Sequence, residues 1–313
     1  MSRLKISFED ARRALGGGQE GALLRKLYLA AGGEESGQEG LAAILRGEQR
    51  ITLVEALIKC ADQHGRLIPP AGFQPQVVDA KRAFHLVQPA LASEDYAVVL
   101  GRLQKYLPGL TFASAKDFQI RSLALVEVLR ADQQAKNLLR GVHLPVTLPK
   151  ITVADYGTTL EEVFLAAVGR SYQAQFPERK FLNHRKGTLA GQVTCVPESR
   201  QDKLLGKLVE GPVTGIYFPA VLQGFSIPAA RAMVQMLPEG FILTGAMETA
   251  TALTAYPETL ARDYQTPGLD CAANVWQSPE NSLIFKAFDD QLEFYSRFLY
   301  AYGYDSSGLL FLG

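Results

Sequence analysis

The fold is decided by residues 213–222, which read Val213-Thr-Gly-Ile-Tyr-Phe-Pro-Ala-Val-Leu222. The run is apolar, β-branched and aromatic, a composition that is typical of a buried strand. Pro228 then opens a helix that we expect to run to Leu237, because the first helical turn needs no proline N–H. A second apolar run follows in Phe241-Ile-Leu-Thr-Gly-Ala-Met247. The order strand, helix, strand predicts a sheet with helical crossovers.

The rest of the second half extends this alternation. We predict helices over 159–176, 199–209 and 248–256, and strands over 191–196 and 271–276. Two further runs, 282–288 and 292–298, flank the turn Asp289-Asp290 and predict an antiparallel hairpin. The second half is therefore expected to be an α/β domain with a mixed, partly antiparallel sheet.

The first half carries helix signals instead. A capping hydroxyl stands three residues before a carboxylate in Ser7-x-x-Asp10, Ser36-x-x-Glu39, Thr52-x-x-Glu55 and Ser114-x-x-Asp117. Helical spacing over 53–65 ends at Gly65, and 93–107 reads as a helix that Pro108-Gly109 closes. Residues 123–129 are apolar almost all round, which indicates a buried central helix. These signals predict an N-terminal helical bundle.

We expect the two halves to be separate domains. Pro145 and Pro149 bias the residues before them toward extended geometry, so helix is not expected over 141–150. Up to residue 150 the chain has 20 Lys and Arg residues and 15 Asp and Glu residues, and after it 12 and 17. The sequence thus predicts an all-helical domain at 1–148 and an α/β domain at 149–313.

Bulk composition points to a folded cytoplasmic protein. The chain of 313 residues is 47% hydrophobic and 20% charged, which excludes a largely disordered chain. Three well-separated cysteines argue against a disulfide framework, and the apolar stretches are far too short for a membrane span. An excess of five cations over the first 150 residues is too weak to indicate nucleic-acid binding.

The densest cationic stretch is a candidate anion site. Within residues 178–188, the cationic side chains and the hydroxyl that follows them are Arg179, Lys180, His184, Arg185, Lys186 and Thr188. Guanidinium and ammonium groups suit phosphate or carboxylate. The alternative is a solvated loop whose charges face water.

A second candidate site lies at the expected strand ends, where ligands of parallel sheets bind. Gln223 and Ser226 follow one strand, and Glu248 and Thr249 follow the next. A partly desolvated Glu248 would have a raised pKa and act as a general base, with His184 as a second catalytic candidate. The alternative role for Glu248 is a helix N-terminal residue that interacts with the dipole.

Other motifs favour structural roles. Gly16-Gly17-Gly18-Gln19-Glu20-Gly21 matches a dinucleotide-binding pattern, but a charged amphipathic segment precedes it where that chemistry needs a buried strand. Four histidines without paired spacing predict no metal site, and His64 and His85 are expected near helix C-termini. The chain identifies no cofactor.

The aromatic run Phe294 to Tyr304 is the last candidate. Alternation on a strand would send Phe294, Phe298, Tyr300, Tyr302 and Tyr304 largely to one face. Such a row serves core packing or a homo-oligomer contact, or stacks on a ring of a ligand.

No motif decides the function. We favour a non-catalytic binding or regulatory protein that recognises an anionic small molecule or a protein partner through its C-terminal domain. The alternative is a hydrolase or transferase acting on a phosphorylated or carboxylated small molecule. A nucleic-acid binder that uses the positive helical half ranks last.

Overall fold

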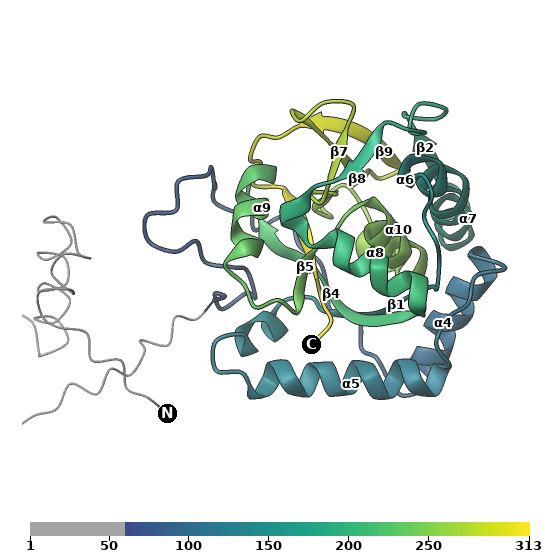
Figure 1. Ribbon diagram of the computed structural model, residues 1–313, viewed down its shortest axis with the longest axis horizontal. Helices are drawn as coiled ribbons and strands as arrows, with labels where there is room; N and C mark the ends of the chain where they lie inside the picture. The colour runs from purple at the N-terminus through teal and green to yellow at the C-terminus, as the bar shows by residue number, and fades with distance from the viewer. Residues whose placement is uncertain (1–59) are drawn as a thin grey trace, which may run out of the picture. The chain divides into compact units, whose positions relative to one another are not determined.

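The computed structural model describes residues 60–313, which belong to one compact unit. Its helices are α4 (Asp95–Tyr106), α5 (Ala115–Ala131), α6 (Tyr156–Thr159), α7 (Ala166–Gln175), α8 (Gln201–Glu210), α9 (Ile227–Gln235), α10 (Ala246–Ala255) and α11 (Pro257–Leu260) (Figure 1). Shorter turns are the 3-10 turns η1 (Lys136–Arg140) and η3 (Pro197–Ser199) and the π turn η2 (Leu160–Leu165).

A mixed sheet of eight strands forms the centre of this unit. Its strands are β1 (Leu144–Leu148), β2 (Lys180–Asn183), β4 (Val213–Gln223), β5 (Phe241–Leu243), β6 (Gly268–Asp270), β8 (Asn281–Ala287), β9 (Gln291–Phe298) and β10 (Asp305–Phe311). The order is β1-β4-β10-β6-β8-β9-β2, and β5 also pairs with β10. Only β10 with β6 and β2 with β9 are parallel. The short strands β3 (Val193–Cys195) and β7 (Asn274–Trp276) pair separately.

Side-chain alternation in β4 builds an apolar core on each face of the sheet. Tyr217 joins the core that contains α4, α7 and α10, whereas its neighbours Ile216 and Phe218 join the core that contains α5 and α9. In β10, likewise, Leu310 joins the first core and its neighbours Leu309 and Phe311 join the second. Because successive residues of a strand point to opposite faces, one uniformly apolar strand serves both cores.

Helix α10 is buried on all sides, since all ten of its residues are buried. The predicted central helix, 123–129, instead lies within α5, which packs against β4 along one side only. Leu123 and Val128 of α5 are half exposed. That prediction was wrong because α5 covers the sheet from outside. The predicted cap is confirmed, since Ser114 Oγ accepts a hydrogen bond from Asp117 N.

The mixed α/β architecture and the hairpin β8–β9 are confirmed, but an N-terminal helical bundle is not supported. Residues 60–65, expected to end a helix, form a turn instead, and residues 66–92 contain no helix. The expected boundary at 148 falls inside the compact unit, at the last residue of β1. The caps before residue 55 and the glycine motif at 16–21 lie outside the described residues.

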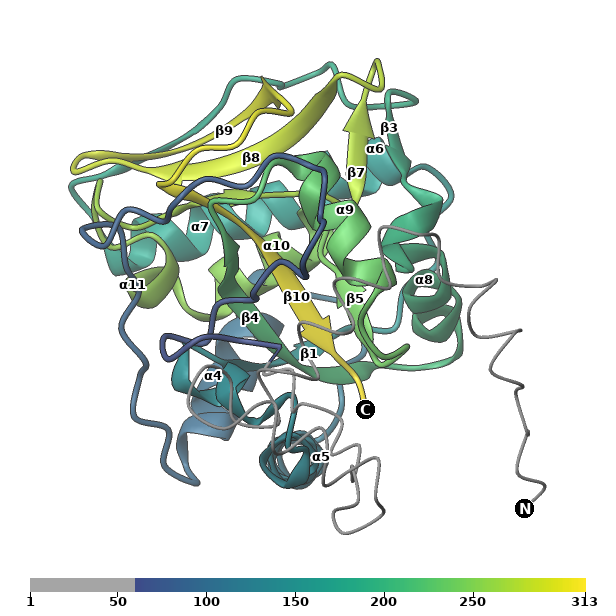
Figure 2. The same cartoon turned by 90° about the vertical axis from the view of Figure 1, so that its left-hand side faces the viewer.

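The segment 60–92 crosses in front of β4 and β10, where it is drawn dark blue (Figure 2). It is anchored by single backbone contacts, among them Leu67 N to Val221 O at 2.8 Å and Val78 N to Gly224 O at 2.9 Å. β1 reaches only as far as Tyr217 along β4, so the edge beyond it is open to this segment. Pro219 lies in that stretch, opposite an irregularity in the β4–β10 register. A proline has no N–H to donate to a neighbouring strand, so it is tolerated at such an irregular position.

Candidate functional site

The side chains of the predicted basic segment do not converge on one concavity. The Arg179 guanidinium stacks on the Phe176 ring at 4.2 Å and donates a hydrogen bond to the backbone carbonyl of Arg262. The Arg185 guanidinium stacks on the Trp276 ring at 4.6 Å. The guanidinium groups of both arginines therefore contact other residues of the protein.

Two lysines of the same segment face a concavity. Lys180 and Lys186 line an open groove of about 580 Å³ between α7 and β2, together with Arg170 of α7. The other predicted residues lie apart from it. His184 Nε2 faces Glu293 Oε2 at 3.6 Å, and Thr188 Oγ1 donates to the Arg185 carbonyl at 2.8 Å.

Glu248, the predicted base, lies in the interior with 3% exposure. Its Oε2 accepts hydrogen bonds from Gln201 Nε2 at 2.6 Å and from the backbone N of Gly245 at 2.8 Å, which leaves Oε1 without a partner in the described chain. Burial raises the pKa of Glu248, while these donors lower it. Its neighbour Thr249 is also fully buried.

Glu248 belongs to a cage that caps α10. Tyr156 Oη accepts from Met247 N at 3.1 Å and donates to Asn274 Oδ1 at 3.1 Å, and Asn274 Oδ1 also accepts from Ala246 N at 2.7 Å. These bonds satisfy the first amides of α10, which have no partner inside the helix. The cage therefore explains Glu248 as a buried helix cap, which was the alternative role expected for it.

Gln223 and Ser226 have separate roles. Ser226 Oγ caps α9 by accepting from Ala229 N at 3.2 Å. Gln223 Nε2 donates to the carbonyls of Phe84 and Gly303, both at 3.0 Å, and thereby fastens the segment 60–92 onto the end of β4. Gln223 is also the one predicted site residue that lines the pocket described next.

A pocket of about 240 Å³ opens at the free edge of β4. Its charged or imidazole side chains are all basic: His64, Arg66, His85 and Arg140. We refer to it as the basic pocket. No Asp or Glu lines it, and within residues 60–313 neither arginine side chain forms a salt bridge or a hydrogen bond. Apolar contacts come from Leu86, Val142, Phe218 and Val221.

Two glycines hold the basic pocket together. Gly65 has φ +76°, and a Cβ there would lie 2.3 Å from Gly141 N. The turn that carries His64 and Arg66 can thus touch the chain just after Arg140 only because position 65 has no side chain. Asp62 Oδ1 fixes the same turn by accepting from the backbone N atoms of His64 at 2.7 Å and Arg66 at 2.9 Å.

A second cavity of about 640 Å³ adjoins the basic pocket. Gln63, His64, Arg66 and Gln223 line both, so the two form a continuous recess under the segment 60–92. The larger cavity adds acidic as well as basic groups, Asp62, Asp79 and Arg82. Its charge is therefore mixed, and the concentration of positive charge belongs to the basic pocket.

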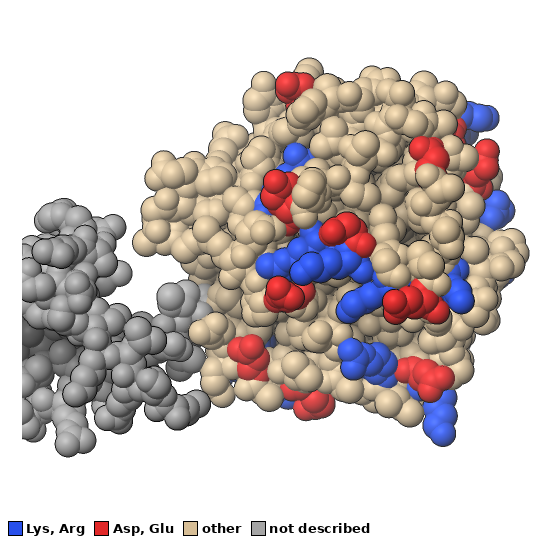
Figure 3. Space-filling model, in the orientation of Figure 1, with Lys and Arg blue, Asp and Glu red and all other residues tan. Residues whose placement is uncertain are grey.

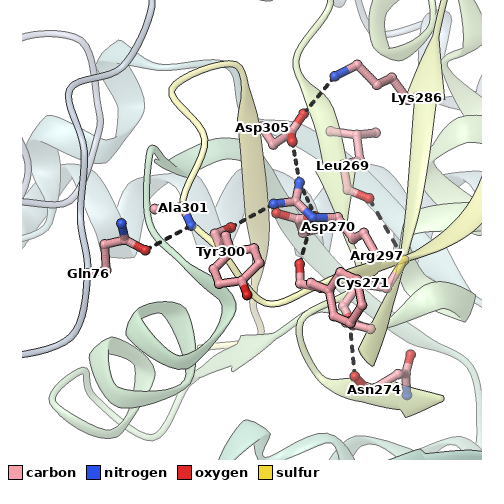
Figure 4. Close-up of polar contacts among 12 residues, drawn as sticks. Gln76, Leu269, Asp270, Cys271, Asn274, Lys286, Arg297, Tyr300, Ala301 and Asp305 are labelled. Atoms are coloured by element: carbon pink, nitrogen blue, oxygen red, sulfur yellow. Dashed lines mark hydrogen bonds and ion pairs between the residues drawn. The ribbon is translucent and has the colours of Figure 1, made fainter. Parts of the chain in front are cut away.

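A buried ionic cluster lies at the first residue of β10, Asp305. Arg297 Nη1 lies 3.3 Å from Asp270 Oδ1 and pairs with Asp305, whose other oxygen lies 3.2 Å from Lys286 Nζ (Figure 4). Arg297 Nη2 also donates to the carbonyl of Tyr300 at 2.7 Å. Lys286 and Arg297 contact the carboxyl groups of Asp270 and Asp305 here, so the cluster fastens β6, β8, β9 and β10 to the loop that follows β9.

The aromatic run does not form one face. Phe294 is fully buried and packs on Phe285 at 4.7 Å between ring centroids. β9 ends at Phe298, which is exposed together with Tyr300 in the following loop. The expectation of one aromatic face was wrong because it assumed a strand that continues to residue 304.

The three cysteines are free thiols. Burial raises the pKa of Cys60 to about 11 and that of Cys195 to about 12, so neither is activated as a nucleophile. In the described part of the chain, no group of three or more His, Cys, Asp or Glu side chains is arranged to hold a metal ion. Within residues 60–313, no helix has the length and apolar character that a bilayer crossing requires.

The surface charge is mixed on the face that carries α8, where Lys and Arg side chains alternate with Asp and Glu (Figure 3). Lys203 of α8, for example, lies 3.6 Å from Glu239. This face therefore presents no broad area of one sign.

We compared the chain with known protein families, curated proteins and solved structures. No family model, no curated protein and no solved structure matches the chain. Functional inference therefore rests on the sites themselves.

Sequence reasoning missed the basic pocket. His64 and His85 were interpreted as helix-terminal residues, and Arg66 and Arg140 were not selected. One signal was present: His-Gly-Arg at 64–66 and Arg-Gly-Val at 140–142 both place a glycine beside basic residues. Nothing in the sequence shows that these two glycines meet.

Proposed function

We propose that this protein is a non-catalytic binding or regulatory protein that recognises an anionic small molecule in the basic pocket. The observation that carries the proposal is the lining of that pocket, which has four basic side chains and no acidic one. With the histidines neutral, Arg66 and Arg140 already give the lining two positive charges. Each histidine adds one when it is protonated.

Phosphate and carboxylate are the groups that fit this lining best. A guanidinium offers paired N–H donors that match the oxygens of both anions. The apolar side chains Leu86, Val142 and Phe218 exclude water from one side of the pocket, and a lower local dielectric strengthens such contacts. The volume of about 240 Å³ suits the anionic end of a small molecule, and the adjoining cavity has room for its remainder.

The test is calorimetric titration of the full chain with inorganic phosphate and with pyrophosphate. Arg66→Gln and Arg140→Gln are each expected to weaken binding about tenfold or more, because a hydrogen bond to a charged group contributes about 1.5–3 kcal/mol. Lys203→Gln on α8 is the matched control, since it removes one positive charge from an exposed side chain outside the pocket. It is expected to leave the affinity unchanged.

Two results would reject this function. One is the absence of phosphate or pyrophosphate binding at low ionic strength. The other is an equal loss of affinity in Arg66→Gln, Arg140→Gln and Lys203→Gln, which would indicate general attraction to a cation-bearing surface. Binding that weakens with salt in the wild type and less steeply in the arginine variants supports the pocket.

The alternative is a hydrolase or transferase on a phosphorylated or carboxylated substrate, with Glu248 as base and His184 as partner. We rank it second because Glu248 is 3% exposed and His184 faces Glu293, and neither residue lines the basic pocket. Glu248→Gln separates the two functions. The binding proposal expects unchanged phosphate affinity and no reaction with phosphoesters in either form.

Two further proposals concern the setting of the protein. The three free thiols fit a reducing compartment, so we infer a cytoplasmic location, which cell fractionation tests. Phe298, Tyr300 and Tyr302 are exposed and would serve a homo-oligomer contact. Sedimentation of wild-type chain and of Tyr300→Ser tests that contact.

A further inference from the structure

Strand β2 forms one end of the sheet. It pairs in parallel with β9 on one side, and no strand of residues 60–313 pairs with its other side. Figure 1 shows it at the outer side of the molecule beside α7. β2 therefore presents backbone groups that a further strand would pair with.

The register identifies which backbone groups are free. Lys180 N donates to Asp290 O at 3.1 Å and His184 N donates to Phe294 O at 2.9 Å, so the even-numbered residues face β9. In a parallel ladder, alternate residues point to opposite sides. The N–H and C=O groups of Phe181 and Asn183 consequently point to the open edge.

The open groove of about 580 Å³ accompanies this edge. Gly169 of α7 allows the contact between helix and strand, because a Cβ there would lie 3.0 Å from Phe181 Cδ1. Lys180, Lys186 and Arg170 stand along the groove against one carboxylate, Glu161. Arg170 Nη2 already donates a hydrogen bond to the Tyr106 carbonyl at 2.6 Å. The three cations still exceed the one carboxylate, so the net charge of the groove is positive.

We propose that an acidic, extended segment of a partner protein adds to the free edge of β2 as a further strand. Backbone hydrogen bonds to Phe181 and Asn183 supply the pairing, and the ammonium groups of Lys180 and Lys186 select carboxylate side chains along the groove. This surface is separate from the basic pocket, because no residue lines both. The proposal therefore stands or falls independently of the proposed function.

The probe is a fluorescein-labelled peptide of alternating Glu and Val, titrated against the full chain by fluorescence anisotropy. A peptide of alternating Lys and Val is the charge control. A version of the acidic peptide with every backbone amide N-methylated is the backbone control, because it keeps every charge and loses its hydrogen-bond donors. Binding of the acidic peptide is expected to be at least about tenfold tighter than binding of either control.

Variants and amide exchange locate the peptide. Lys180→Glu with Lys186→Glu is expected to weaken binding about tenfold or more, whereas Lys203→Glu with Lys207→Glu on α8 is the matched double reversal and is expected to change it less than twofold. The bound peptide is expected to slow hydrogen exchange at the amides of Phe181 and Asn183.

Three results would overturn the proposal. The first is equal binding of the N-methylated peptide, which would indicate charge attraction alone. The second is unchanged exchange at Phe181 and Asn183 in the presence of acidic peptide. That result would mean that the charge of Lys180 prevents other strands from pairing with this short edge. The third is complete competition by inorganic phosphate, which would identify the groove as a small-anion site.

Discussion

Gly65→Ala is the substitution that tests how the basic pocket is built. Gly65 has φ +76°, and an added Cβ would lie 2.3 Å from Gly141 N, 2.6 Å from Gly141 Cα and 2.8 Å from Leu138 O. All three contacts are with backbone, so no side chain can rotate to relieve them. The turn at 62–66 would have to separate from residues 138–141, which moves His64 and Arg66 away from Arg140.

The expected cost has two parts. A positive φ costs an alanine about 1–2 kcal/mol, and a Cβ forced into packed backbone adds about 1–3 kcal/mol. Gly72→Ala isolates the first part, because Gly72 has φ +82° and nothing lies within 4 Å of its added Cβ. Gly65→Ala is therefore expected to destabilise the protein by about 2–5 kcal/mol in total, and Gly72→Ala by about 1–2 kcal/mol.

Urea unfolding followed by circular dichroism measures both variants against the wild type. Gly65→Ala is expected to lower the urea midpoint by a clearly larger amount, with an unchanged slope. It is also expected to weaken phosphate binding, whereas Gly72→Ala leaves the affinity unchanged. If Gly65→Ala and Gly72→Ala lowered stability equally, the contact between the turn and Gly141 would not support the pocket, and the reasoning would be refuted.

Three more predictions concern the buried charges and the thiols. Arg297→Met removes the buried cation that contacts both Asp270 and Asp305 and is expected to cost about 3–5 kcal/mol in urea unfolding; a loss below about 1 kcal/mol would contradict this. Burial raises the pKa of Asp270 to about 8, so its stabilising contribution is full below about pH 4 and lost as the pH rises through about 8. Asp270→Asn is expected to flatten that decline, and identical pH profiles would disprove the assignment. Cys60 and Cys195 are expected to react slowly with iodoacetamide at neutral pH, and rapid alkylation of the folded protein would count against their raised pKa values.

The central strands were predictable where composition alone defines them. β4 and β5 are apolar on both faces, as a strand between two helical layers must be. The apolar run at 241–247 nevertheless continues past β5 into the buried helix α10, which begins at Ala246. β10 escaped prediction although it lies beside β4. It begins Asp305-Ser-Ser-Gly, and Ser306 and Ser307 are fully buried. Because these residues are polar, the sequence pattern does not indicate a buried strand here.

The candidate sites were predictable only in part, because each combines residues that are distant in sequence. Two residues of the basic segment, Lys180 and Lys186, line the same groove, but Arg185 stacks on Trp276, about ninety positions away. The basic pocket joins the turn at 62–66 to Arg140 through two glycines and to the open edge of β4. Such contacts depend on where β1 ends along β4, which the sequence pattern does not specify.

Chemical-shift mapping of the isotope-labelled full chain with inorganic phosphate decides whether anions bind between the 62–66 turn and Arg140. We expect the amide signals of Gly65, Arg66, Gly141 and Val142 to move together and saturably, while those of Phe181 and Asn183 stay in place. Saturable shifts confined to β2, or no saturable shifts at the basic pocket, would show that the anion does not bind there.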